Sequence, residues 1–529
     1  MKKLIINFSL FLSLLTVISG CKKDLEEKFN NPEKATEANL PGLLTGILNN
    51  DRVRPSYYNV RTFLLVQPAV YSQTASFISA NSAYQQNDGY IEQYWNNFYS
   101  PNANGSGVLG MYRSMELVYS SLSETEKASQ EVFIQAARIV LYDQASQMVD
   151  LWGDIPFTEA ASIVNTNTFS YAKYDNQKDL YNYFITELDK SATYFSTAAS
   201  NSIFSKYDIL SSGNLDKWRR YANSVRLRLL MRMSNSDETF AKTEVQKMLA
   251  SPTQYPLVDG GNVANYSPIA SDILLRPLTN FTSNLRDGLT EIGSYYAPDY
   301  MLNTVMLPAN DPRIPVIFDK YGRTVSGKFV QNATYRAMPI TFTSTQQEGG
   351  FADYAILDSA TFLQNQYLPG PVITAPEVNF LKAEAFERWG GGDAAASYEM
   401  AVRQSITYYY YLNSINTGFT AVPAPDANTV NAFIASAATA YTGSSAQKLV
   451  KIWNQKWLHF GFLQSVQAWS EYRRTGYPQL TFPVQTLTGF ENPPVRLRYP
   501  TSERSLNAAN YAAVQEKDTR TTKIFWDIN

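Results

Sequence analysis

Residues 374–409 read TAPEVNFLKAEAFERWGGGDAAASYEMAVRQSITYY, and this stretch carries the clearest folding signal in the chain. Candidates for an inner face recur at helical spacing in two runs: Val378, Leu381, Ala385 and Trp389, then Tyr398, Ala401, Val402, Ser405 and Tyr409. Three glycines, 390–392, separate the runs and would end the first helix. The pattern predicts two amphipathic helices joined by a short loop, an αα-hairpin of roughly tetratricopeptide size.

Both helices of this hairpin have a recognisable start. Thr374-Ala-Pro-Glu377 has the form of a capping box, in which the Thr374 hydroxyl accepts from the backbone near Glu377 and the Glu377 carboxylate reaches back. Asp393 occupies the equivalent position before the second run and can cap it. We therefore expect the two helices to begin at Thr374 and Asp393.

The same period of 3.6 residues recurs elsewhere in the chain. Further helices are predicted at 138–151, 178–195, 216–233 and about 444–475. The stretch 216–233 contains six Lys and Arg, but the net charge of the whole chain is -2, which offers no footprint for nucleic acid. We interpret those six cations as a solvated or ion-paired face. The predicted fold class is predominantly all-α.

Two regions lack the helical period. Residues of about 60–100 and 250–370 are rich in Pro, Gly, Asn, Thr and Tyr. A segment as long as the second is improbable in a compact domain unless it forms functional loops. Within it we expect only a few short strands, with 325–331 and 338–343 as the candidates.

Aromatic residues are abundant and charged residues are scarce. Aromatics make up 14% of the chain, with 36 Tyr, and charged residues make up 17%, below the typical ~25%. Core packing must account for most of the aromatics. Tyr also presents a flat apolar face and a hydroxyl, which suits stacking on sugar rings or peptides.

The sequence offers little for catalysis or metal binding. Its one His, His459, lies in an apolar-aromatic run and is interpreted as a packed core residue, and its one Cys leaves no set of His and Cys for a zinc site. Glu377 and Glu384 share a helix face, so a surface glycoside hydrolase that uses two carboxylates stays a weaker alternative. We expect no catalytic residue, no metal and no cofactor.

The N-terminus has the form of a lipoprotein signal. Met-Lys-Lys precedes an apolar run, and small residues precede Cys21, the only cysteine. We expect residues 1–20 to be removed, Cys21 to carry the lipid, 21–35 to form a flexible tether and 36–529 to fold as a single domain. An ordinary secretory peptide with an incidental cysteine is the alternative.

Six segments together resemble the SusD/RagB family of nutrient-binding outer-membrane lipoproteins. They are VDLWGDIPFTEA (149–160), DKWRRYANSVRLRLLMRMS (216–234), DPR (311–313), APEVNFLKAEAFERWG (375–390), KIWNQKWLHFGFLQSVQAWSEYRRTGYP (451–478) and RLRYPTSE (496–503). Their order and spacing, with Cys21 in front, carry the resemblance. It implies a mostly helical scaffold of tetratricopeptide-type helix pairs, with irregular ligand-binding loops and a few short strands.

The resemblance also implies a function and a place. A family member would sit on the outer membrane of a Gram-negative bacterium, held by its lipid and facing the cell exterior. It would capture a glycan or a peptide and deliver it to a SusC-like TonB-dependent transporter. Trp is missing from 71–90 and 295–354, the loop windows that hold the candidate aromatics, which shifts the expected ligand slightly toward peptide. A structural lid of the transporter without its own ligand affinity is the alternative.

Ligand residues of the family come from variable loops, so no binding motif can be carried over. We therefore select aromatic residues in the two loop regions as candidates for ligand contact. The candidates are Tyr71, Phe77, Tyr84, Tyr90, Tyr295, Tyr296, Tyr335 and Tyr354. Packing in the core is a competing explanation for each of them taken singly.

Overall fold

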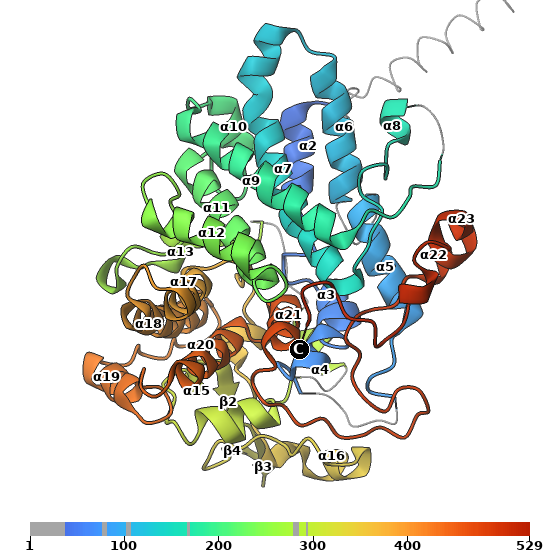
Figure 1. The fold of residues 1–529 in the computed structure, drawn as a ribbon. Coiled ribbons are helices and arrows are strands. Elements are labelled where there is room, and N and C mark those ends of the chain that lie inside the picture. The colour runs from blue at the N-terminus through green and yellow to red at the C-terminus, as the bar shows by residue number, and fades with distance from the viewer. Residues whose placement is uncertain are drawn as a thin grey trace, which may run out of the picture.

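The computed structural model describes residues 38–76, 82–101, 107–166, 170–278, 285–291 and 295–528. Helices dominate this part of the chain (Figure 1), which confirms the predicted fold class. The predictions made for residues 1–35, including Cys21, and for Phe77 lie outside the described residues. None of the helices in the described ranges combines the length and the hydrophobicity that crossing a bilayer requires.

The first half of the chain builds a layer of helices around the long helix α7. This helix begins with a true capping box, formed by Ser123 and Glu126, and most of its C-terminal part is buried. It packs against α6 and α9, and α9 packs against α11. The helices of this half are α2 (Leu40–Leu48), α3 (Tyr57–Asn59), α4 (Pro68–Ser72), α5 (Asp88–Tyr99), α6 (Val108–Ser120), α7 (Glu124–Trp152), α8 (Ile163–Thr166), α9 (Gln177–Thr197), α10 (Ser202–Tyr207), α11 (Leu215–Met233) and α12 (Glu238–Ala250).

The second half begins with irregular structure and returns to helices at α17. The hairpin predicted from 374–409 is confirmed as α17 and α18, which pack closely against each other. The helices are α13 (Pro268–Ser271), α14 (Leu285–Thr290), α15 (Ile314–Ile317), α16 (Ser344–Gly350), α17 (Ala375–Trp389), α18 (Ala394–Ser414), α19 (Ala427–Ala435), α20 (Ser445–Phe460), α21 (Ser465–Thr475), α22 (Thr501–Leu506) and α23 (Ala508–Tyr511).

Short elements occupy much of the predicted loop regions, and β6 and η6 lie after them. Three are π-helical turns and three are 3-10 turns: η1 (Val60–Leu64), η3 (Tyr300–Met306) and η5 (Ser359–Leu363), then η2 (Val263–Asn265), η4 (Phe351–Asp353) and η6 (Gln515–Lys517). The strands are β1 (Ile273–Leu275), β2 (Phe318–Asp319), β3 (Gly322–Val325), β4 (Lys328–Gln331), β5 (Ile356–Leu357) and β6 (Gly370–Ile373). Within the described ranges they pair antiparallel as β1–β6, β2–β5 and β3–β4.

The two strand predictions have different outcomes. The stretch 325–331 spans the end of β3, a turn and all of β4. In that turn Ser326 has φ 50° and Gly327 has φ 79°, and two left-handed residues in succession are what a tight two-residue hairpin turn requires. The prediction of a strand at 338–343 is wrong, because no strand is formed there.

The capping box predicted at Thr374 is wrong. The Thr374 hydroxyl lies 2.7 Å from Nε2 of His459, and the Glu377 carboxylate accepts from Nε of Arg228 at 2.6 Å. The backbone N–H of Ala375 donates instead to Oδ1 of Asp272, at 2.9 Å. A carboxylate more than 100 residues away in sequence thus caps α17, and local spacing cannot reveal such a partner.

The single helix predicted at 444–475 is also wrong, because Gly461 divides it into α20 and α21. Gly461 has φ 50°, and a left-handed residue at the end of a helix stops it. The other predicted stretches, 138–151, 178–195 and 216–233, lie within α7, α9 and α11 and are confirmed. Asp393 caps α18, as expected, through the backbone N–H of Ala396.

Three of the six cations of α11, Arg226, Arg228 and Arg232, are buried and ion-paired rather than solvated. Arg228 is bound by Glu377 of α17, and also by Asp143 of α7 at 3.1 Å. Arg232 is bound by Asp150 of α7 and by Glu471 of α21, both at 2.8 Å. Buried charges are costly without partners, so these pairs fix α11 against three other helices.

Candidate ligand-binding surface

Backbone hydrogen bonds bring three irregular segments together at the lower end of the molecule in Figure 1. The N–H of Ala297 donates to the carbonyl of Ala355 at 2.9 Å, and the N–H of Ala355 donates to the carbonyl of Arg336 at 2.8 Å. Tyr296 also forms an isolated β-bridge with Ile356. These bonds place the backbones that carry Tyr295, Tyr335 and Tyr354 next to one another.

Tyr295 and Tyr296 form a contacting pair. Their hydroxyls lie 3.2 Å apart and their ring centroids 4.6 Å apart. The Tyr296 side chain is almost fully buried, and this burial raises its pKa well above the usual value. Tyr295 remains half-buried. Tyr296 therefore supports the outer ring of Tyr295 and offers little face of its own.

The hairpin β3–β4 adds the most exposed aromatic side chain of this region. Phe329 is 60% exposed, and its ring centroid lies 6.4 Å from that of Tyr321. Phe351, which is 44% exposed, lies at the same distance on Tyr321. None of these three residues was selected from the sequence. The only sequence signal for this group was that Phe329 lies in the stretch 325–331, which was expected to form a short strand. A Phe in a strand is equally compatible with a buried position.

Tyr354 connects the rings to charged groups. Its ring is 6.0 Å from Phe342 and 4.8 Å from Cζ of Arg336. Arg336 donates to the backbone carbonyl of Asp353, and the Asp353 carboxylate pairs with Arg323. We call Tyr295, Tyr321, Phe329, Phe351 and Tyr354 the aromatic surface. Guanidinium and carboxylate groups thus border a set of partly exposed rings.

Tyr335 lies at the edge of this region. Its ring is half-buried and 5.3 Å from Nζ of Lys320. Burial raises the pKa of Tyr335, and the nearby carboxylates of Asp319 and Asp358 add to the effect. Burial, together with the charge of Asp319, also raises the pKa of Asp358 to about 6.

Tyr90 belongs to a separate polar cluster and not to the aromatic surface. Its hydroxyl accepts from Nη1 of Arg61 at 3.0 Å, and Nε of Arg61 donates to Glu291 at 2.5 Å. The hydroxyl of Tyr57 donates to the same carboxylate oxygen at 2.7 Å. Tyr90 is half-buried, so it remains a proposed contact, but at a different place on the protein.

Tyr71 and Tyr84 lie in the core and cannot stack on a ligand from outside. Both are 0% exposed. The Tyr71 ring packs 5.0 Å from Trp469, and the Tyr84 hydroxyl donates to the carbonyl of Pro483 at 2.9 Å. Their burial therefore contradicts the prediction that they contact the ligand. The polar, weakly periodic sequence around them did not reveal that α4, which carries Tyr71, and the turn at 82–84 pack against the C-terminal part of the chain.

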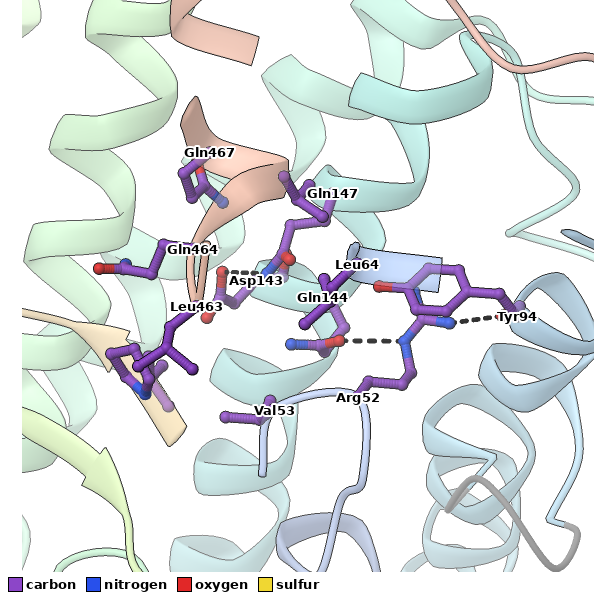
Figure 2. Close-up of a pocket in the computed structure, with 13 residues that line it drawn as sticks. Arg52, Val53, Leu64, Tyr94, Asp143, Gln144, Gln147, Leu463, Gln464 and Gln467 are labelled. Carbon is purple, nitrogen blue, oxygen red and sulfur yellow. Dashed lines mark hydrogen bonds between the residues drawn. The ribbon is translucent and has the colours of Figure 1, made fainter. Parts of the chain in front are cut away.

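A small cavity lies inside the molecule and is too small for a sugar. Its volume is about 40 Å³, whereas pockets for small organic ligands measure about 300–1,000 Å³. Figure 2 shows Arg52 at its wall, donating to Gln144 at 3.2 Å and to the carbonyl of Tyr94. Gln147 and Asp143 bond to each other across another wall. A polar space of this size can hold only a few water molecules.

The residues considered for catalysis are buried and occupied. Glu377 and Glu384 are at most 1% exposed, and they pair with Arg228 and Arg474. No substrate reaches this pair of carboxylates. The two ring nitrogens of His459 hydrogen-bond to the hydroxyls of Thr374 and Ser405. Over the described ranges, no group of three His, Cys, Asp or Glu could hold a metal ion.

Comparison with known proteins identifies close architectural relatives. The profile of the SusD-like family, described as "Starch-binding associating with outer membrane", matches residues 31–500. Solved structures with the same fold include a chitin-binding protein, 23% identical with a TM-score of 0.73, which covers 93% of this chain and 100% of its own. A chitin-binding SusD homologue from Flavobacterium johnsoniae is 21% identical, with a TM-score of 0.68 and coverage of 93% and 99%.

A third structure, a SusD homologue from Parabacteroides distasonis, gives a similar result. It is 21% identical, with a TM-score of 0.69, and the alignment covers 93% of this chain and 98% of that one. A comparison with curated protein sequences gave no significant match. At these identities the structural likeness establishes the fold, and the profile match establishes the sequence relationship.

Proposed function

Because this chain belongs to the SusD-like family, we propose that it is a nutrient-binding lipoprotein of the bacterial cell surface that captures a glycan on its aromatic surface. We further propose that Cys21 anchors it to the outer membrane, facing outward, and that it delivers the glycan to a SusC-like TonB-dependent transporter. The family description, which names starch binding and association with the outer membrane, supports both parts.

The observation that carries the proposal is the exposure of Phe329 and Phe351 beside Tyr321. Large apolar rings at the surface cost solvation free energy, and a contiguous group of them is typical of a binding site. Sugar rings present C–H faces that stack on such side chains, and the neighbouring Arg336 and Asp353 can hydrogen-bond to hydroxyl groups. The starch and chitin named for relatives favour a glycan over a peptide.

The proposed mechanism is passive capture. The glycan gains free energy by covering the exposed rings, and the polar groups at the border set its orientation. Affinity should be weak to moderate, since the ligand has to be released to the transporter. No bond of the glycan is broken in this step, and the energy for transport comes from the partner.

A second candidate function is a structural lid of the transporter without ligand affinity. The burial of Tyr71, Tyr84 and Tyr296 favours it, because three of the candidate aromatics face the core and not the solvent. The exposure of Phe329 and Phe351 favours capture instead. Measuring ligand binding decides between the two functions.

The test is the double variant Phe329→Ala with Phe351→Ala. Affinity electrophoresis and isothermal titration calorimetry with starch and chitin oligosaccharides should show a loss of affinity of about tenfold or more, because two stacking partners are removed. The melting temperature should change by less than about 2 °C, since exposed side chains contribute little to stability.

Tyr171→Ala is the matched control. Tyr171 is 48% exposed and its carbonyl accepts from Asn510 of α23, which lies at the right of Figure 1, away from the hairpin at the bottom. This variant should bind as the wild type does. Unchanged affinity in the double variant would disprove the assignment of the aromatic surface. Failure of the wild type to bind any glycan on an array would favour the lid.

A further inference from the structure

A second hollow lies in the helical scaffold, and glycan capture as proposed makes no use of it. Its volume is about 520 Å³, within the range of about 300–1,000 Å³ that is typical of small-molecule sites. It is bounded by the start of α11, the end of α12, the segment 251–259 and Lys382 of α17. In Figure 1 these helices lie together, away from the hairpin β3–β4. We call this hollow the scaffold pocket.

One side of the scaffold pocket is apolar and held firmly in place. Leu249, Pro256 and Leu257 contribute to it, and Leu249 is the half-buried one of the three. Tyr255 also lines this side, with Arg226 at 5.7 Å and Lys247 at 5.6 Å from its ring. A wall of this kind can cover the apolar face of a compact ligand.

The other side is charged, and two of its cations are already neutralised. Arg220 pairs with Asp216 at 2.6 Å, and Lys382 pairs with Asp259 at 3.1 Å. All four of these residues line the pocket. Together they contribute no net charge, so they supply hydrogen-bonding groups rather than an electrostatic preference.

Arg219 is the exception. Its Nη2 donates to the carbonyls of Thr253 and Gln254, at 3.2 and 2.6 Å, which fixes the guanidinium against the segment 251–259. Within the described part of the chain, no carboxylate forms an ion pair with it. A guanidinium has five N–H donors, more than these two bonds occupy. The lining therefore has a net positive charge, and a fixed cation lacks an anionic partner.

From this combination we propose that the scaffold pocket binds a small carboxylate on a compact ring, as in a uronic acid. The ligand carboxylate pairs with Arg219, since charge-assisted bonds from a guanidinium to a carboxylate are among the strongest hydrogen bonds in proteins. The ring lies against Leu249 and Leu257, and its remaining polar groups meet Arg220 and Asp259. The site is independent of the aromatic surface and does not rest on the proposed glycan capture.

Ligand-observed NMR on the full-length protein tests the proposal with three probes. Glucuronate carries a carboxylate on a sugar ring, benzoate carries one on a plain ring, and glucose lacks the carboxylate. Binding of glucuronate with no binding of glucose supports the proposal, and additional binding of benzoate extends the class to other ring carboxylates. Equal binding of glucose, or no binding of either acid at about 10 mM, overturns it.

Arg219→Gln identifies the residue responsible. Gln keeps an amide donor for the two carbonyls but removes the charge, so the affinity for glucuronate should fall about tenfold. Lys242→Gln is the matched control, because it removes one exposed cation from the neighbouring helix α12 without touching the pocket. Unchanged binding in Arg219→Gln overturns the proposal.

A second variant tests the pocket without changing Arg219, in case Arg219→Gln affects folding. Thr253 is exposed at the rim of the pocket, so Thr253→Trp should obstruct it without disturbing the core. Glucuronate binding should be lost while the melting temperature is kept. The double variant Phe329→Ala with Phe351→Ala should retain glucuronate binding, and its loss there would place the acid on the aromatic surface instead and overturn the assignment.

Discussion

His459 shows at the residue scale how packing fixes the state of a titratable group. The imidazole is buried between the hydroxyls of Thr374 and Ser405. Burial lowers its pKa to about 3, and the charge of Arg313 adds to the effect. The unfolded chain would bind a proton at His459 below a pH of about 6.5, whereas the folded protein stays neutral there.

This difference makes stability depend on pH in a definite direction. The contribution of His459 is intact above pH 6.5 and is lost as the pH falls toward 3, by about 1.4 kcal/mol per unit. We predict that His459→Gln reduces the loss of unfolding free energy between pH 7 and pH 5 by about 2 kcal/mol relative to the wild type. Urea titrations at both pH values measure it.

Other buried groups titrate in the same range, so the comparison has to be made between the two proteins. Burial raises the pKa of Asp272 to about 7, and its contribution to stability is lost as the pH rises through that value, opposite in sign to that of His459. This effect is common to wild type and variant. Identical pH slopes in the two proteins would contradict the assigned state of His459.

The sequence predicted single residues well where a local pattern decides their environment. The apolar-aromatic run around His459 predicts a packed core residue, and this side chain is 1% exposed. Tyr84 was misplaced because its burial depends on Phe482 and Pro483, about 400 residues later. Loop aromatics have no period that separates a buried ring from an exposed one.

At the scale of elements, the helices were predictable and their partners were not. α17 and α18 follow from two amphipathic runs with glycines between them. The carboxylate that caps α17, Asp272, and the acids that bind Arg228 and Arg232 come from distant parts of the chain. The sequence shows how many charges there are but not which of them meet, so buried ion pairs resemble a solvated face.

The hairpin β3–β4 depends on Gly322 at its base. A Cβ at this position would lie 2.1 Å from the carbonyl oxygen of Val330 and 2.8 Å from Cα of Gln331. Gly322→Ala should therefore separate the strands and displace Phe329. We predict a loss of glycan affinity of about tenfold with little change in melting temperature, because the hairpin is mostly exposed.

Gly349→Ala provides the control for this experiment. Gly349 lies in α16, close to the hairpin in Figure 1, and a Cβ there would meet no atom within 4 Å. This variant should bind glycan as the wild type does. Hydrogen exchange of 322–331 reports the hairpin directly. Wild-type exchange and affinity in Gly322→Ala would show that the strands tolerate the methyl group.

At the scale of the whole molecule, the proposed location rests on Cys21. Replacing Cys21, the proposed site of lipidation, would remove every acyl chain of the proposed anchor, and none of the described helices is suited to crossing a bilayer. We predict that Cys21→Ala shifts the protein from the membrane fraction to the soluble fraction of the cells that produce it. Immunoblots of the two fractions measure this shift, and continued membrane association would contradict the lipid anchor.

The ion pairs of α11 have a consequence for the order in which the protein can acquire its structure. A chain made from its N-terminus produces Arg228 and Arg232 after Asp143 and Asp150, their partners in α7, but long before their second acids, Glu377 and Glu471. Until those acids arrive, closing the first helical layer would bury cations with an incomplete set of counter-charges. The first helical layer therefore completes its ion pairs only after α17 and α21 have been made.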